Sequence, residues 1–242
     1  MSVKVTVLVE NSVPLSVGLL GEHGLAYFIE AGGKKILFDT GQGRAIVNNA
    51  RFLGFKLEEV STLVLSHGHF DHTGGIPALL EKNKDIEMIA HPDVFDEKLT
   101  KRSEDLFFPI GMPMKKELIE MKGVSMRMVK EPVEIAPGVT TTGEVPMITD
   151  FEKIEPNLLM KKDGETGVDT LLDDLSLMID TGDGTALVLG CCHRGIVNTL
   201  NRVKELNGGK PVHTIMGGLH LVGADDQRIA ATIDALKEFD IQ

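Results

Sequence analysis

The feature that most constrains this chain is a cluster of three histidines and an aspartate at residues 67–72, HGHFDH. The cluster directly follows the apolar run 63–65, which predicts a buried strand that ends where the cluster begins. Neutral imidazoles and carboxylates are the usual ligands of catalytic zinc, which keeps one coordination position open for water or substrate. The segment therefore predicts a metal centre at the end of a strand.

The spacing of the cluster divides its ligands between two ions. In an extended segment, residues two apart point the same way, so His67 and His69 can share one metal. If the chain then turns into a helix, Asp71 and His72 face a second metal, as in hydrolytic sites whose ions lie roughly 3.5–4 Å apart. We therefore expect two divalent cations, most simply zinc, with manganese, magnesium or iron as alternatives.

The composition bounds the class of protein. The chain has 242 residues, 42% hydrophobic and 25% charged, as expected for one soluble domain spanning residues 1–242. A net charge of −11 argues against nucleic acid as a partner, because binding a polyanion requires a basic surface. No membrane span or signal peptide is expected, and the two cysteines, Cys191 and Cys192, are adjacent and unsuited to a disulfide. We expect a cytoplasmic protein without a membrane partner.

Hydrophobic periodicity predicts strands and helices along the whole chain. Two hairpins are expected, one pairing residues 25–30 with 35–39 and the other pairing 175–180 with 185–190. The remaining predicted elements are strands at 1–9, 63–66, 87–90 and 213–216, a glycine-rich loop at 17–24, and helices at 45–52, 76–81, 196–206 and 227–239, the last with Ile229, Ile233, Leu236 and Phe239 facing the core.

Residues 93–135 have mixed periodicity and are rich in Lys, Glu, Met and Pro, which predicts an insertion or lid. Its apolar patch, residues 107–114, either lines a pocket or packs as an irregular loop on the core.

Further histidines follow predicted strand ends, where sheets commonly place their chemistry. His193 follows the strand at 185–190, and His220 follows the strand at 213–216. His91 follows the strand at 87–90, where it either points into a cleft to bind substrate or caps the turn before Pro92. Functional groups therefore follow predicted strand ends at three places: residues 67–72, His193 and His220.

With these residues assembled, the chain resembles the metallo-β-lactamase fold superfamily. The likeness rests on FDTG at 38–41 and on SHGHFDHTGG at 66–75. Residues 190–199, GCCHRGIVNT, and 217–221, GGLHL, are similar to a narrower branch that contains metal-dependent hydrolases and dihydropterin-methyl ribofuranosylaminobenzene-phosphate synthases. The resemblance covers essentially the whole chain.

The resemblance implies an α+β fold, a four-layer αββα sandwich with a dinuclear site at one edge between its sheets. Carried over residue by residue, it implies one metal held by three histidines and a second held by mixed ligands. It also implies that Asp39 orients a ligating histidine. The implied ligands are His67, His69 and His193 for the first metal, and Asp71, His72 and His220 for the second.

The chain departs from the superfamily pattern in two places. Many members carry an aspartate that bridges the metals at the later strand end, where this chain has Cys191 and Cys192. A thiolate there would favour a softer metal, whereas buried cysteines without a ligand role are the alternative. Relatives in the branch also continue past the last helix into a strand with another histidine, so at residue 242 either a tail is missing or the site is completed differently.

The leading functional hypothesis is hydrolysis of a small ester, lactone or phosphate-containing substrate. Two metals would lower the pKa of a bridging water and present hydroxide to a carbonyl or phosphoryl centre. Asp71 and His72 are the expected catalytic residues. Arg194 either holds a carboxylate or phosphate of the substrate or forms a surface salt bridge.

Three other functions stay open. The branch resemblance implies a transferase that couples a dihydropterin diphosphate to a ribofuranosylaminobenzene phosphate, with loss of pyrophosphate. An iron-binding redox protein would use Cys191 and Cys192, although two cysteines fall short of the four usual for a cluster. A nuclease ranks last because the chain is acidic. The sequence does not decide whether the chain forms homo-oligomers.

Overall fold

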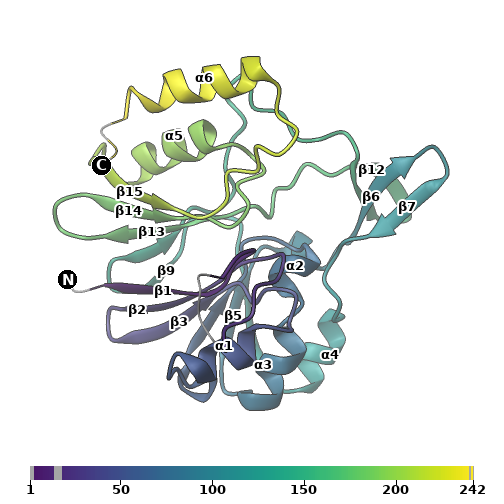
Figure 1. Cartoon of the computed structure of the whole chain (residues 1–242), viewed down its shortest axis with the longest axis vertical. Helices are drawn as coiled ribbons and strands as arrows, with labels where there is room; N and C mark the ends of the chain where they lie inside the picture. The colour runs from purple at the N-terminus through teal and green to yellow at the C-terminus, as the bar shows by residue number, and fades with distance from the viewer. Residues whose placement is uncertain (1–2, 14–17, 240, 242) are drawn as a thin grey trace.

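The computed structural model describes residues 3–13, 18–239 and 241, and its core has four layers (Figure 1). Two mixed β-sheets lie face to face, and helices cover the outer side of each sheet. The predicted α+β sandwich of the αββα type is confirmed. Among the described residues, no helix combines the length and the apolar character that crossing a membrane requires.

The first sheet contains six strands, and helices pack on its outer face. Its first three strands pair antiparallel, whereas the last three join in parallel through helical connections. In sheet order the strands are β1 (Lys4–Val9), β2 (Ala26–Ala31), β3 (Lys34–Phe38), β4 (Thr62–Val64), β5 (Glu87–Ala90) and β8 (Ser125–Met128); the helical segments are α1 (Ile46–Phe52), η1 (Leu57–Glu59), α2 (Phe70–Thr73), α3 (Ile76–Lys82), η2 (Pro92–Phe95) and α4 (Lys116–Met121).

The second sheet contains five strands and carries two helices on its outer face. A hairpin joins two of its strands, and a helical crossover places the strand at one edge parallel to its neighbour. In sheet order the strands are β15 (Val212–Met216), β14 (Thr185–Val188), β13 (Leu177–Asp180), β10 (Val139–Thr141) and β9 (Glu134–Ala136), and the helices are α5 (Ile196–Leu206) and α6 (Asp226–Leu236).

Alternation along the strands explains why the layers stack in this order. Ile36 and Phe38 of β3 point into the core between the sheets, where Ile179 of β13 meets them. Leu37, between them in sequence, points the other way into the core beneath the helices of the first sheet. Leu187 of β14 belongs to a third core under α5 and α6. Because these strands are buried on both faces, their alternating side chains contribute to three hydrophobic cores, one between the sheets and one under the helices on each outer face.

A small third sheet projects to one side of these layers (Figure 1). It differs from the predicted insertion at 93–135 because half of its strands come from outside that range, while α4 and β8 inside the range belong to the main layers. The patch at 107–114 lies partly in one of its strands, with Phe107 and Phe108 exposed. In sheet order the strands are β12 (Glu165–Val168), β11 (Leu158–Lys162), β6 (Glu97–Ser103) and β7 (Leu106–Pro109).

Most predicted elements agree with the structure. Both predicted hairpins are confirmed as the β2–β3 and β13–β14 pairs, and the helices predicted at 45–52, 76–81 and 196–206 correspond to α1, α3 and α5. The predicted inner face of the last helix is wrong in part, because Thr232 is buried there and Ile233 is half exposed.

Some predicted segments reach beyond the described residues. Met1 and Ser2 of the predicted first strand lie outside them, and β1 begins at Lys4. Val17 of the predicted glycine-rich loop also lies outside, whereas residues 18–24 form no helix or strand. Asp240 and Gln242, at the end of the sequence, are likewise not described.

Candidate metal centre

The histidine cluster changes from extended chain to helix, as its spacing predicts. The backbone of His69 is extended, with φ −72° and ψ 147°, and α2 begins at the next residue. His67 and His69 therefore reach the space between the sheets from a loop, whereas Asp71 and His72 reach it from the helix. All four side chains are buried.

Three imidazoles converge to form the first candidate metal site. One nitrogen from each of His67, His69 and His193 lies within 4.8 Å of the others, and the ring centroids are 4.5–4.9 Å apart. The Nε2 atoms of His67 and His69 and both ring nitrogens of His193 are buried without a hydrogen-bond partner among the described residues. Because buried polar atoms are normally paired, this set of three nitrogens would fit a divalent cation such as zinc, which catalytic sites hold with three protein ligands.

Burial sets the protonation of these three histidines. It lowers the pKa of His69 to about 3 and places the pKa values of His67 and His193 well below the ordinary value. Repulsion from neighbouring cationic groups acts in the same direction at His67 and His193. The rings are therefore neutral near pH 7, which is the form that binds a metal.

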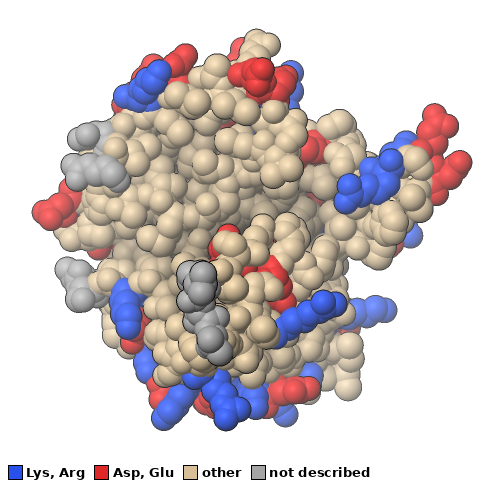
Figure 2. Space-filling view, viewed as in Figure 1, with Lys and Arg blue, Asp and Glu red and all other residues tan. Residues whose placement is uncertain are grey.

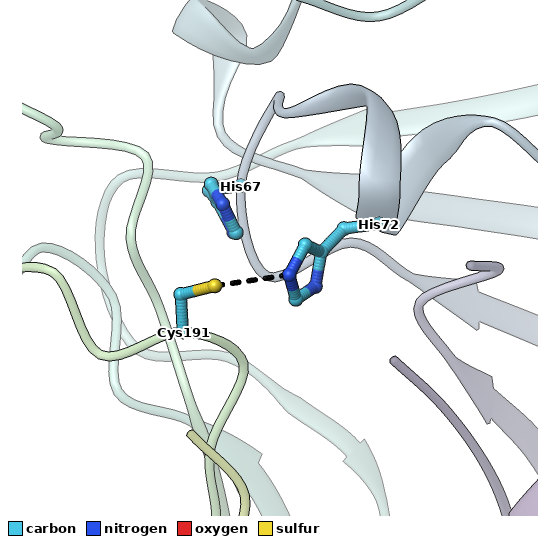
Figure 3. A group of neighbouring side chains, drawn as sticks. All are labelled: His67, His72 and Cys191. Carbon is cyan, nitrogen blue, oxygen red and sulfur yellow. Dashed lines mark hydrogen bonds between the residues drawn. The ribbon is translucent and has the colours of Figure 1, made fainter. Parts of the chain in front are cut away.

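A second group of candidate ligands combines nitrogen with sulfur (Figure 3). Nε2 of His72 lies 3.0 Å from Sγ of Cys191, and His67 completes a set whose ligand atoms lie within 4.8 Å of one another. The two histidines come from the loop and helix after β4, and Cys191 comes from the loop after β14 on the opposite sheet. The sequence had left Cys191 open between a ligand and a buried apolar residue; its sulfur faces the histidines.

Asp39 fixes the orientation of His72. Its Oδ2 accepts hydrogen bonds from Nδ1 of His72 at 2.6 Å and from Oγ of Ser66 at 2.7 Å, and its Oδ1 accepts one from the Ser66 N–H at 2.7 Å. With the proton on Nδ1, the lone pair of Nε2 is directed at Cys191. Asp39 has a left-handed backbone, with φ 61°, a strained conformation that is common at functional sites.

The contacts of His72 also shift its pKa. Burial, the largest single influence, lowers the pKa of His72, but Cys191 and Asp39 together outweigh it and raise the pKa well above the ordinary value. Burial raises the pKa of the Cys191 thiol, against the opposing effect of His72. Without metal, both pKa shifts favour the protonated form of the side chain concerned.

His220 lies at the outer side of the cluster. Its ring centroid is 4.0 Å from that of His193, and it forms a third ligand set with His193 and Cys191. Nε2 of His220 also lies 3.3 Å from Oε1 of Glu155. The structure thus brings His220 to the cluster beside Cys191.

Asp71 stands between the cluster and solvent. Its Oδ2 is 3.5 Å from Nε2 of His72 and 3.3 Å from Nε2 of His23, whose side chain is exposed. Asp71 belongs to none of the three close ligand sets among the described residues. Together with His72 and Cys191 it lines a cavity of about 210 Å³.

A larger hollow of about 480 Å³ lies between residues 150–156 and the start of α6. Glu155 lines this hollow and also contacts His220. On the face seen in Figure 2, a few acidic side chains lie near the middle, and charged side chains of both signs lie around the rim, with lysines and arginines most numerous at its lower edge.

Two predicted substrate-binding residues have other contacts in the structure. The guanidinium of Arg194 is buried and donates from Nε to the carbonyl of Val145 and from NH1 to that of Thr170. His91 caps the start of η2 by accepting the Asp93 N–H, which confirms the capping alternative. Its Nε2 contacts Glu144, so His91 does not point into the candidate site.

Sequence reasoning missed His23 and Glu155 as neighbours of the cluster. His23 lies in a glycine-rich loop, and no local pattern indicates that this loop folds over Asp71. A weak signal was present, because Gly24 sits where a side chain would collide with the Asp71 carbonyl, at 2.2 Å. Glu155 is one of many acidic residues, and only the tertiary fold brings it to His220.

Comparison with known proteins agrees with this geometry. The sequence model of the metallo-β-lactamase superfamily matches residues 20–190, more than half of the chain. The chain belongs to this superfamily. Its fold, its candidate metal sites and its relatives together identify it as an enzyme of a metal-dependent superfamily.

Similarity to individual proteins covers essentially the whole length of this chain. It is 34% identical to the 7,8-dihydropterin-6-methyl-4-(β-D-ribofuranosyl)-aminobenzene-5′-phosphate synthase of Methanocaldococcus jannaschii, across 100% of this chain and 85% of that protein. It is 30% identical to an uncharacterised protein of the same organism, across 98% of this chain and 86% of that protein. Its fold matches the crystal structure of a metal-dependent hydrolase of the β-lactamase superfamily, with a TM-score of 0.83, 24% identity, and coverage of 100% and 86%.

Proposed function

We propose that this chain is a metal-dependent hydrolase that binds two divalent cations between its sheets and acts on a small ester, lactone or phosphate-containing substrate. The observation that carries the proposal is the set of unpaired, buried ring nitrogens of His67, His69 and His193. Left without a cation, these nitrogens would cost free energy in the folded state, roughly 1–3 kcal/mol for each unsatisfied group. A bound metal removes that cost and explains the arrangement.

The ligands divide between the two ions by chemistry. His67, His69 and His193 would hold the first ion, and His72 with Cys191 would hold the second, with Asp71 and His220 near enough to complete its coordination. Thiolate and imidazole ligands suit zinc or iron better than magnesium. We therefore favour zinc as the metal.

The chain's own residues supply the proton transfer. When bound, the cations act as Lewis acids that lower the pKa of a water molecule toward 7. Asp71 is placed to accept the proton that the attacking water loses, because its carboxylate lines the cavity beside His72. His23, 3.3 Å from Asp71 and exposed, passes that proton to solvent. His72 stays fixed through Asp39 while Asp71 exchanges the proton.

A second candidate function is favoured by one specific observation, the 34% identity to a synthase over the full chain. In that reaction a dihydropterin diphosphate would lose pyrophosphate while an aminobenzene derivative attacks the methylene carbon. The 480 Å³ hollow beside Glu155, in addition to the 210 Å³ cavity, leaves room for a second reactant. The two functions share the metal centre and differ in the nucleophile.

Cobalt substitution tests the ligand set with a matched pair of cysteine variants. Cys191 contacts His72, whereas Sγ of the adjacent Cys192 faces Thr199 at 3.5 Å. Cobalt-loaded wild type and Cys192→Ser should show the near-ultraviolet charge-transfer band of a cobalt–thiolate bond, and Cys191→Ser should lose it. Loss in Cys192→Ser alone, or no band in the wild type, would refute the role of Cys191.

Product analysis separates hydrolysis from transfer. Zinc-loaded protein is incubated with phosphate esters, lactones and a dihydropterin diphosphate, each with and without the aryl acceptor. Hydrolysis gives products that do not depend on the acceptor, whereas transfer gives a coupled product only when the acceptor is present. His69→Ala should abolish either activity, and turnover at the wild-type rate by this variant would contradict the proposed centre.

A further inference from the structure

Two adjacent aspartates lie behind the first candidate metal site and hold the two loops that carry its histidines. Oδ2 of Asp173 accepts the backbone N–H of Gly68 at 2.8 Å, and Gly68 stands between His67 and His69. Oδ2 of Asp174 accepts the backbone N–H of Arg194 at 2.9 Å, directly after His193. Both aspartates are buried, with 0% and 3% exposure.

A buried lysine completes the arrangement around Asp173. Nζ of Lys98, on β6 of the projecting sheet, lies 3.0 Å from Oδ1 of Asp173 and 2.7 Å from Oδ2 of Asp169. Lys98 is 1% exposed, and its Cε lies where a side chain on Gly68 would stand, at 2.9 Å. The projecting sheet is thereby anchored to the loop that carries His67 and His69.

The segment that contains these aspartates makes a further contact with the histidine loop. The N–H of Leu175 donates to the carbonyl of Ser66 at 2.9 Å, just before His67. The peptides on both sides of His67 are therefore bonded to residues 173–175. A short segment with no metal ligand of its own thus sets the backbone of both ligand loops.

We propose that Asp173 and Asp174 are positioning residues for the first metal, the former holding the His67–His69 loop through Gly68 and the latter the His193 loop through Arg194. This inference rests on the proposed metal centre. Neither aspartate contacts the cation; each fixes a peptide next to a ligand, so that the three ring nitrogens converge before metal arrives. Lys98 balances the charge that Asp173 buries.

The two aspartates differ in a way that makes the proposal testable. Asp173 uses both of its oxygens, one for Gly68 and one for Lys98, so asparagine at this position can retain only one acceptor. Asp174 uses only Oδ2, and its Oδ1 has no partner among the described residues. The same Asp→Asn change should therefore disturb one site and spare its neighbour.

The experiment measures zinc affinity by competition with a chromophoric chelator, resolving the two binding steps in the full chain. Cys191→Ser should leave binding of the first metal intact. Asp173→Asn and Asp174→Leu should weaken that same binding step by about 10- to 100-fold, which is the range typical for residues that orient metal ligands. Asp174→Asn should stay within about twofold of wild type. The visible spectrum of the cobalt form should change with Asp173→Asn and Asp174→Leu, since the ligand geometry is altered.

Matched controls separate positioning from folding and from the metal centre itself. Asp180→Asn makes the same change at an exposed carboxylate that accepts the Gly182 N–H and pairs with Lys210, and should leave both steps unchanged. Wild-type affinity and cobalt spectrum in Asp173→Asn would overturn the proposal, as would an equal loss in both asparagine variants. If Asp174→Leu does not fold, the asparagine pair alone decides. If His67→Ala binds zinc like wild type, the metal centre fails instead.

Discussion

Asp39 controls which nitrogen of His72 is free, and Asp39→Asn should expose that control. The carboxylate accepts three buried hydrogen bonds, two from Ser66 and one from Nδ1 of His72. Asparagine keeps the size and tolerates the left-handed backbone of this position, φ 61°. It has one acceptor oxygen in place of two, so an N–H₂ group must face either the Ser66 N–H or both Oγ of Ser66 and Nδ1 of His72.

The magnitude follows from the bond that is lost. If the amide oxygen stays on the Ser66 N–H, the amide nitrogen faces Nδ1 of His72, whose proton must move to Nε2. That nitrogen then lacks the lone pair directed at Cys191. A hydrogen bond to a charged group contributes about 1.5–3 kcal/mol, and each 1.4 kcal/mol corresponds to a factor of about ten in affinity. We therefore expect a loss of roughly 10- to 100-fold for the second metal.

The assay is zinc competition with the two binding steps resolved. Asp163→Asn is the matched control, because Asp163 also has a left-handed backbone, φ 52°, but lies exposed in the turn between β11 and β12. Asp39→Asn should weaken the step that Cys191→Ser removes, while Asp163→Asn leaves both steps unchanged. Wild-type affinity of folded Asp39→Asn for both ions would refute the tautomer argument.

Three further predictions concern stability. Lys98→Met leaves Asp169 and Asp173 as buried carboxylates without their counterion, so the free energy of unfolding in urea should fall by about 3–5 kcal/mol. An unchanged free energy of unfolding would contradict the role of Lys98 as the buried counterion of these two aspartates. In metal-free protein the unfolded chain protonates His69 below about pH 6.5, whereas the folded chain protonates it only near pH 3. The free energy of unfolding should therefore fall as the pH is lowered through that window, by up to about 1.4 kcal/mol per pH unit from this residue alone. In acid titrations followed by circular dichroism, His69→Gln should show a shallower slope. Removing metal with a chelator should lower the free energy of unfolding by about 4 kcal/mol relative to protein at a zinc concentration about 1,000 times Kd, and re-addition should restore it; an unchanged thermal midpoint would mean that no metal binds the folded state.

The parts of the fold that a local pattern determines could be predicted from sequence. Two hairpins and three helices follow from hydrophobic periodicity and glycine-containing turns, and the histidine segment carries its own change from strand to helix. The projecting sheet could not be predicted, because β6 pairs with β11 some sixty residues later, through exposed, charged strands without clear alternation. No local rule specifies such a pairing.

The candidate site divides in the same way. His67, His69 and His193 converge because each follows a strand end at one edge of the sandwich, and strand ends are visible in the sequence. The substrate-binding role predicted for Arg194 stays a prediction, because sequence does not show that two backbone carbonyls accept hydrogen bonds from its guanidinium. The side of the chain that Cys191 faces, and the folding of His23 over Asp71, depend on tertiary packing alone.

The metal content of the purified protein tests the central claim most directly. Elemental analysis after purification without chelator, compared with Cys191→Ser and with His67→Ala, counts the ions that each ligand set holds. The account predicts about two equivalents of zinc per chain in the wild type, about one in Cys191→Ser, and fewer than one in His67→Ala. Wild-type protein that binds no divalent metal, even after zinc is added back, would contradict it.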